Sequence, residues 1–174
     1  MSDDFEEYAK TAYLLKAKNI RVRAKRKWSK EFTKNEYEGF LIQLKKCAKI
    51  ASKYNLNICF ENHRKSFTDN RYSTLMLMKE MKNNNVFTYW QPQAYENESQ
   101  RAETIKFLEK YIKSVHVFNR DENFNRFPLA NAKNEWKKYI RYLGKDVNYL
   151  LEFVKDDDLT QFYEDANCLK KLLA

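Results

Sequence analysis

Residues 57–63 read Asn-Ile-Cys-Phe-Glu-Asn-His, a short apolar run that ends in three polar side chains. Two later runs end in a similar way: residues 114–119 read Ser-Val-His-Val-Phe-Asn, and residues 149–154 read Tyr-Leu-Leu-Glu-Phe-Val. Short apolar runs separated by helix-like stretches predict parallel βα units. In such folds the chemistry lies at the carboxyl ends of the strands. Glu61, His116 and Glu152, one from each run, are therefore expected to converge on one site.

The same alternation continues along the whole chain. It predicts five strands, at residues 19–24, 57–62, 86–90, 114–118 and 148–154. Helices are expected before, between and after them, at about residues 4–17, 33–55, 68–82, 99–112, 134–144 and 159–173. Thr33 followed by Glu36 predicts a capping box, Thr68 or Asp69 is expected to open the next helix, and Asn134 is expected to cap a later one.

Length and composition indicate one folded domain. The chain has 174 residues, 43% of them hydrophobic, and shows no internal linker or repeat, so residues 1–174 are expected to form a single domain. No apolar stretch approaches the roughly 20 residues that span a bilayer. The acidic, polar start at residues 1–4 is unlike a secretory signal. Cys47, Cys59 and Cys168 form no metal-type pair and favour free thiols in a reducing cytoplasm.

The net charge of +9 raises the question of a nucleic-acid partner. Most lysines, however, are spread over the predicted helices, as on solvated faces. The one dense basic cluster lies between Arg21 and Lys30 and is interrupted by Trp28. We favour a solvated loop or a contact with an anionic substrate there, with a nucleic-acid surface as the alternative.

The order of these motifs resembles a known family. From about residue 19 to the end, the chain is similar to the later half of the sugar-phosphate isomerase/epimerase family, whose fold is the xylose isomerase-like TIM barrel. The resemblance rests on residues 61–63, on His116 in Val-His-Val-Phe-Asn, and on three further motifs at 128–136, 150–153 and 165–170. It implies an α/β fold: a partial (β/α) TIM-type barrel of about five parallel strands with outer helices.

A complete barrel of this type has eight strands and typically about 250 residues. Five strands leave two sheet edges unpaired, and such edges invite pairing with another chain. The expectation is a homo-oligomer or a partner chain that completes the barrel. There are two alternatives: the N-terminal helix covers one of the edges, or the chain is part of a longer protein that supplies the other strands.

The resemblance also implies a metal site with four ligands. Three carry over as Glu61, His116 and Glu152, whereas Gln91 stands where the family has an aspartate. A glutamine offers a neutral oxygen and removes one negative charge. Binding of Mn²⁺ or Mg²⁺, or of Zn²⁺, should therefore be weak or absent.

The implied activity is metal-dependent isomerisation or epimerisation of a sugar or sugar phosphate through an enediolate. Glu61 and Glu152 would act as paired acid and base. His63 or Arg64 would contact substrate hydroxyls, and Arg23 a phosphate or carboxylate.

Two other functions remain open. A non-catalytic barrel remnant, acting as a subunit or binding module, is favoured by the missing strands and by Gln91. An abasic-site endonuclease shares the fold but uses many histidine ligands, and the presence of only His63 and His116 in this chain argues strongly against it. Considered without the resemblance, Glu152 also fits a surface or salt-bridged residue and His116 a core histidine.

Overall fold

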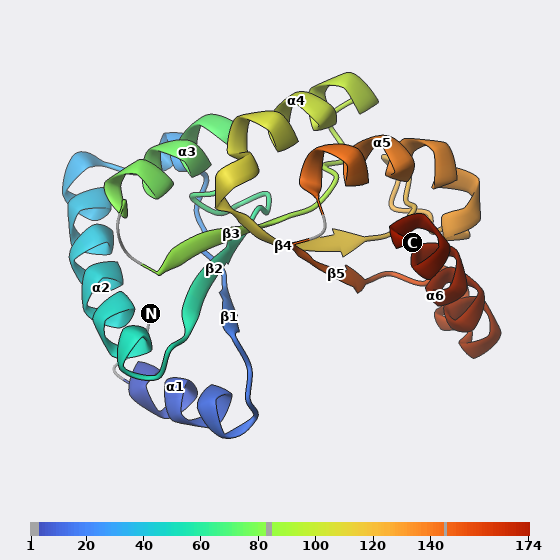
Figure 1. The fold of residues 1–174 in the computed structure, drawn as a ribbon. Coiled ribbons are helices and arrows are strands. Elements are labelled where there is room, and N and C mark those ends of the chain that lie inside the picture. The colour runs from blue at the N-terminus through green and yellow to red at the C-terminus, as the bar shows by residue number, and fades with distance from the viewer. Residues whose placement is uncertain (1–3, 83–84, 145) are drawn as a thin grey trace. The chain divides into compact units, whose positions relative to one another are not determined.

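The structure is a computed structural model that describes residues 4–82, 85–144 and 146–174 (Figure 1). Its strands are β1 (Asn19–Val22), β2 (Asn57–Glu61), β3 (Val86–Trp90), β4 (Ile112–Val117) and β5 (Asn148–Leu151). Its helices are α1 (Phe5–Leu14), α2 (Lys34–Lys53), α3 (Arg71–Glu80), α4 (Glu98–Leu108), α5 (Lys133–Leu143) and α6 (Leu159–Leu173). None of these helices combines the length and the apolar character needed to cross a membrane.

The strands pair in chain order, β1–β2–β3–β4–β5. The pairs β1–β2, β2–β3 and β4–β5 are parallel, with Asn19 opposite Asn57, Ile58 opposite Val86 and Ser114 opposite Asn148. A helix follows every strand, which is the arrangement of βα units. The predicted α/β fold with five parallel strands and connecting helices is confirmed. β1 and β5 are the two edge strands of this sheet.

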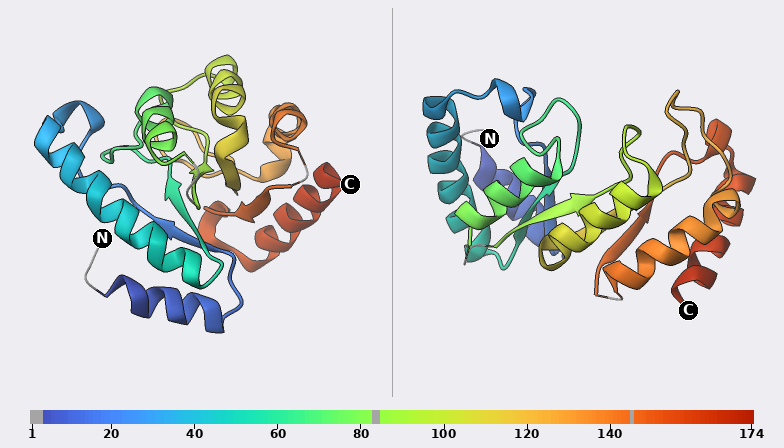
Figure 2. Two further views of the ribbon diagram at one scale, coloured as in Figure 1. Left: turned by 60° about the vertical axis from the view of Figure 1, so that its left-hand side comes forward. Right: turned by 90° about the horizontal axis from the view of Figure 1, so that it is seen from above.

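The chain divides into two compact units, Met1–Tyr89 and Trp90–Ala174. The expectation of a single domain stays a prediction. In the first unit, α1 and α2 lie side by side (Figure 2), and α2 packs on β2. Its core is aromatic: the Phe40 ring lies 5.9 Å from the Phe60 ring and 6.1 Å from the Phe67 ring, measured between centroids. All three rings are at most 3% exposed.

The second unit is built around tryptophans. In it α5 packs against α4 and α6, and β4 pairs with β5. The Trp136 ring lies 6.1 Å from Trp90 and 5.5 Å from Tyr139, and each of these side chains is 1% exposed or less. The indole N–H of Trp136 donates a 3.0 Å hydrogen bond to the carbonyl oxygen of Phe118. This bond ties α5 to the backbone that follows β4.

The helix starts were predicted with mixed success. The capping box of Thr33 and Glu36 is confirmed. The next helix begins later than predicted, because Asn70, and not Thr68 or Asp69, accepts hydrogen bonds from the amides of residues 72 and 73. Asn134 is not an N-cap: α5 begins one residue earlier, after a short 3₁₀ turn that ends at Ala132.

Two predicted ends were also wrong. The helix expected over 99–112 ends at Leu108, and after a 3₁₀ turn Ile112 already belongs to β4. The fifth strand stops at Leu151, short of residue 154, because Phe153 takes a φ of +56° that a strand cannot continue. Residues 83 and 84, expected to close α3, lie outside the described residues.

Gly39 lies in the interior of α2, where glycine costs about 1 kcal/mol relative to alanine. A Cβ at this position would meet no atom within 4 Å. We therefore expect Gly39→Ala to raise the free energy of unfolding by about 0.5–1 kcal/mol in urea denaturation. An unchanged or lower value would contradict this expectation.

Candidate metal centre

The carboxyl ends of β4 and β5 are held in register by the parallel ladder. His116 lies opposite Leu150, and Val117 lies opposite Leu151. Glu152 follows the last residue of β5, and its amide donates a 3.0 Å hydrogen bond to the carbonyl oxygen of Val117. Glu152 is therefore fixed by the sheet although it lies one residue beyond the strand.

Three predicted site residues are in contact within the second unit. The Nδ1 atom of His116 lies 3.1 Å from Oε1 of Gln91 and 3.3 Å from Oε2 of Glu152. His116 and Gln91 are 4% and 6% exposed, and the Glu152 side chain is 27% exposed. One ring nitrogen thus faces an amide oxygen and a carboxylate oxygen in a largely buried site.

This donor set suits a divalent cation. Oxygen ligands favour Mg²⁺ or Mn²⁺, and imidazole with carboxylate favours Zn²⁺ as well. Two oxygens converge on a single histidine nitrogen, so a cation bound there would have three donor atoms from three consecutive strand ends. The residues present therefore fit a metal. Gln91 brings no charge to it, as the sequence indicates.

The β3–α4 loop that follows Gln91 is fixed by a residue that the sequence did not single out. Arg101 donates to the carbonyl oxygen of Gln93 from Nε and Nη2, at 3.2 and 3.1 Å. Its Nη1 atom also lies 2.8 Å from Oε1 of Glu135 in α5. A lone arginine in a charged helix gives no sequence signal of this role.

A second unpredicted arginine lies in the loop after β4. The Arg120 guanidinium carbon lies 5.0, 4.8 and 4.6 Å from the ring centroids of Phe118, Phe124 and Phe153. Phe153 directly follows Glu152, and Phe118 is two residues past His116. The repeated pairing of phenylalanine with arginine in residues 118–127 is the only signal that the sequence offered.

Glu61 ends β2 in the first unit and is 8% exposed. One of its carboxylate oxygens lies 3.8 Å from an Arg21 nitrogen, and the other lies 3.9 Å from an Arg23 nitrogen. The Thr68 hydroxyl donates to the Glu61 carbonyl oxygen at 2.6 Å, which fixes the backbone at this strand end. Arg23, predicted to contact a substrate anion, thus lies beside the Glu61 carboxylate.

His63 and Arg64 lie in the loop between β2 and α3. The imidazole Nδ1 of His63 lies 2.5 Å from the Arg64 carbonyl oxygen, and the His63 carbonyl accepts a hydrogen bond from Ser66. Arg64 is exposed, and His63 is half-buried. Their predicted contacts with substrate hydroxyls stay predictions.

No protein-family model matches this chain, and no curated protein sequence matches it. Solved structures do. A probable 3-DHS dehydratase from Bacillus anthracis superposes with a TM-score of 0.79 at 18% identity, over 96% of this chain and 68% of its own. The fold is part of a xylose isomerase-like TIM barrel.

Two other solved structures give similar values. D-psicose 3-epimerase from Clostridium cellulolyticum, solved with D-tagatose, has a TM-score of 0.67 at 15% identity, covering 97% of this chain and 69% of its own. A xylose isomerase-like TIM barrel protein from Mycobacterium smegmatis, solved with magnesium, has a TM-score of 0.67 at 11% identity, covering 98% and 67%. Another similar structure contains a zinc atom.

At these identities the similarity establishes the xylose isomerase-like fold and nothing finer. This chain spans about two thirds of the length of the structures that it matches. The resemblance to a later part of the barrel is therefore confirmed at the level of the fold.

Proposed function

We propose that this chain belongs to a metal-dependent isomerase or epimerase that acts on a sugar or sugar phosphate. The contact of Gln91, His116 and Glu152 at three consecutive strand ends carries this proposal. In parallel α/β barrels, substrates bind at that edge. The similarity of the fold to a sugar epimerase and to metal-containing structures supports the same conclusion.

Within this proposal, Glu61, His116 and Glu152 would be the charged and nitrogen ligands of one divalent cation, and Gln91 would add a neutral oxygen. The two carboxylates supply two negative charges, which balance a divalent cation. A bound cation would supply Lewis-acid polarisation of a substrate carbonyl. Mn²⁺, Mg²⁺ and Zn²⁺ all fit the donor types.

The two glutamates would also move protons. A carboxylate at one side of the sugar removes a proton from the carbon next to the carbonyl, and the carboxyl group at the other side returns one. Glu61 and Glu152 come from different strand ends, which suits them to opposite faces of a substrate.

In the first unit, arginine side chains would bind the anionic group of the substrate. Arg21 and Arg23 both lie near the Glu61 carboxylate. Within the proposal, Arg23 would contact a phosphate or carboxylate of the substrate, because its planar guanidinium group suits both anions. His63 and Arg64 would contact hydroxyls from the loop after β2.

The alternative is a non-catalytic module with the barrel fold, completed by a partner chain or a second copy. Two observations favour it: Gln91 replaces an acid, and the chain spans about two thirds of similar structures. The basic charge adds little to the nucleic-acid alternative, because Arg21, Arg23 and Lys27 face carboxylates of their own unit.

Proton exchange with solvent tests the enzymatic proposal. The purified chain, incubated in D₂O with Mn²⁺ and a panel of ketoses, is expected to place deuterium on the carbon next to the carbonyl, as measured by NMR. Glu152→Gln should abolish the exchange. Cation binding without exchange of any ketose would instead support the non-catalytic alternative.

A further inference from the structure

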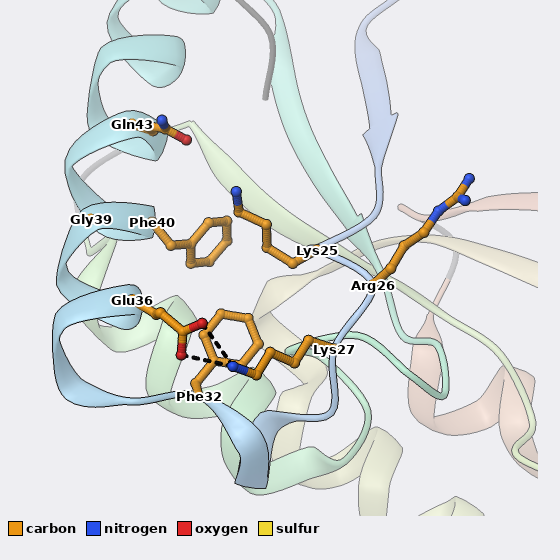
Figure 3. A pocket seen from close by; sticks show the side chains of 8 residues that line it. All are labelled: Lys25, Arg26, Lys27, Phe32, Glu36, Gly39, Phe40 and Gln43. Carbon is orange, nitrogen blue, oxygen red and sulfur yellow. Dashed lines mark hydrogen bonds and ion pairs between the residues drawn. The ribbon is translucent and has the colours of Figure 1, made fainter.

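A cavity of about 390 Å³ lies in the first unit between α2 and the segment that follows β1 (Figure 3). Its size is in the range of small-molecule sites. Residues 25–27 and Phe32 form one wall, and α2 forms the other. None of its lining residues belongs to the proposed metal centre, so this cavity is a separate feature of the chain.

The helix wall consists of Glu36, Gly39, Phe40 and Gln43. Their spacing of three and four residues places all of them on one face of α2. Gly39 leaves the middle of this face without a side chain, since a Cβ there would have no neighbour within 4 Å. The chain has only two glycines, and one of them lines this cavity.

The base of the cavity is aromatic. Phe40 is 3% exposed and belongs to the core, and the Phe32 ring lies 6.4 Å from it, measured between centroids. Phe32 also packs edge-on against Phe67, with 4.9 Å between centroids. These rings are held by the core, so they present a fixed apolar surface to a ligand.

The lysines around the cavity differ in whether they are already paired with a carboxylate. The Lys27 ammonium lies 2.7 and 2.8 Å from the two carboxylate oxygens of Glu36, and this contact, together with hydrogen bonds from Thr33, lowers the pKa of Glu36 to about 2. Lys27 and Glu36 therefore neutralise each other. Lys25 points toward Phe40 and Gln43, whereas Arg26 points away from the cavity (Figure 3). Within residues 4–82, Lys25 has no ion-pair partner.

Lys25 is held in a strained turn. Its φ is +62°, a left-handed conformation that is uncommon for lysine, and its amide donates a 3.0 Å hydrogen bond to the Arg23 carbonyl oxygen. Residues in such conformations cluster at ligand sites. This turn directs the Lys25 ammonium toward the cavity, and no carboxylate within residues 4–82 forms an ion pair with it.

We propose that this cavity binds a small organic carboxylate with an apolar body. Lys25 holds the carboxylate at the mouth, where the Gln43 amide can add a hydrogen bond. The apolar body lies against Phe40 and Phe32, over the gap left by Gly39. A monoanion is the matching charge, because Lys25 is the one cation of the cavity in this unit that is directed inward and not already paired.

Titration of the ¹⁵N-labelled protein with phenylacetate tests this proposal. The Gly39 amide lies at the cavity and the Gly144 amide lies in the other unit, so the two glycine signals report binding and its control in one spectrum. Phenylacetate is expected to shift the Gly39 signal to saturation and to leave Gly144 unchanged. The neutral isostere phenylacetamide and inorganic phosphate should bind at least about tenfold more weakly.

Variants separate the two lysines. Lys25→Gln should weaken phenylacetate at least about tenfold, whereas Lys30→Gln, a matched charge loss outside the cavity, should change it by less than about twofold. Glu36→Gln should tighten binding, because it frees Lys27. Lys25→Gly suits the positive φ, so its loss of binding would not reflect damage to the turn. Gly39→Leu should fill the cavity and block binding.

Several results would overturn the proposal. They are equal binding of phenylacetate and phenylacetamide, unchanged affinity in Lys25→Gln, or shifts that never saturate. Inorganic phosphate competing as strongly as phenylacetate would reduce the site to a general anion contact and would also reject it.

Discussion

Gln91→Asp is expected to tighten Mn²⁺ binding at least about tenfold relative to the native chain. The substitution adds a negative charge next to the Nδ1 atom of His116, which already lies 3.1 Å from the Gln91 oxygen. Because the site is largely buried, solvent screens this added charge only weakly. Isothermal titration calorimetry with MnCl₂ and MgCl₂ measures the effect.

The longer Gln91→Glu keeps the reach of the native side chain and should show a gain of the same sign. Asn134→Asp is the matched control: it converts an exposed amide of the same unit into a carboxylate, on helix α5 and not at a strand end. Its effect on affinity should stay within about twofold.

Glu152→Gln is expected to abolish cation binding, because it removes the carboxylate 3.3 Å from the His116 nitrogen. If the native chain and both Gln91 variants all fail to bind a cation, the metal site is absent. The enzymatic proposal would then fall, and the non-catalytic alternative would stand. The carboxylate cavity would be unaffected, since its residues and its NMR readout are separate.

Trp136→Ala is expected to lower the free energy of unfolding by roughly 3–5 kcal/mol. The ring is 1% exposed, packs on Trp90 and Tyr139, and donates to the Phe118 carbonyl oxygen. Its removal leaves a cavity and a carbonyl without its donor. Urea denaturation followed by circular dichroism measures the loss.

Two variants show whether this loss is specific. Trp136→Phe keeps an aromatic ring but loses the N–H, and its cost should be smaller. Tyr163→Ala removes a ring that is 59% exposed in the same unit and should cost about 0.5 kcal/mol or less. A cost below about 1 kcal/mol for Trp136→Ala would show that the second unit does not depend on this core. If Trp136→Ala does not fold at all, the order of the other two variants still tests the argument.

The existence of the strands was predictable because it depends on local patterns. The apolar runs 57–60, 86–90 and 114–117 all became strands, and the capping box at Thr33 set the start of α2. Ends were less predictable. Asn134 has the residue type of an N-cap, but the preceding 3₁₀ turn starts α5 earlier, and the positive φ of Phe153 ends β5 before Glu152.

The sequence by itself determined the α/β class and the positions of Glu61, Gln91, His116 and Glu152 at strand ends, because short apolar runs and local capping specify each βα unit. Only the tertiary structure decided which of these side chains touch. The contact of His116 with Gln91 and Glu152 joins three strands that are far apart in sequence. The pairing of Arg21 and Arg23 with Glu61, and of Lys27 rather than Lys25 with Glu36, likewise depends on side-chain directions across packed elements. No local pattern encodes those directions.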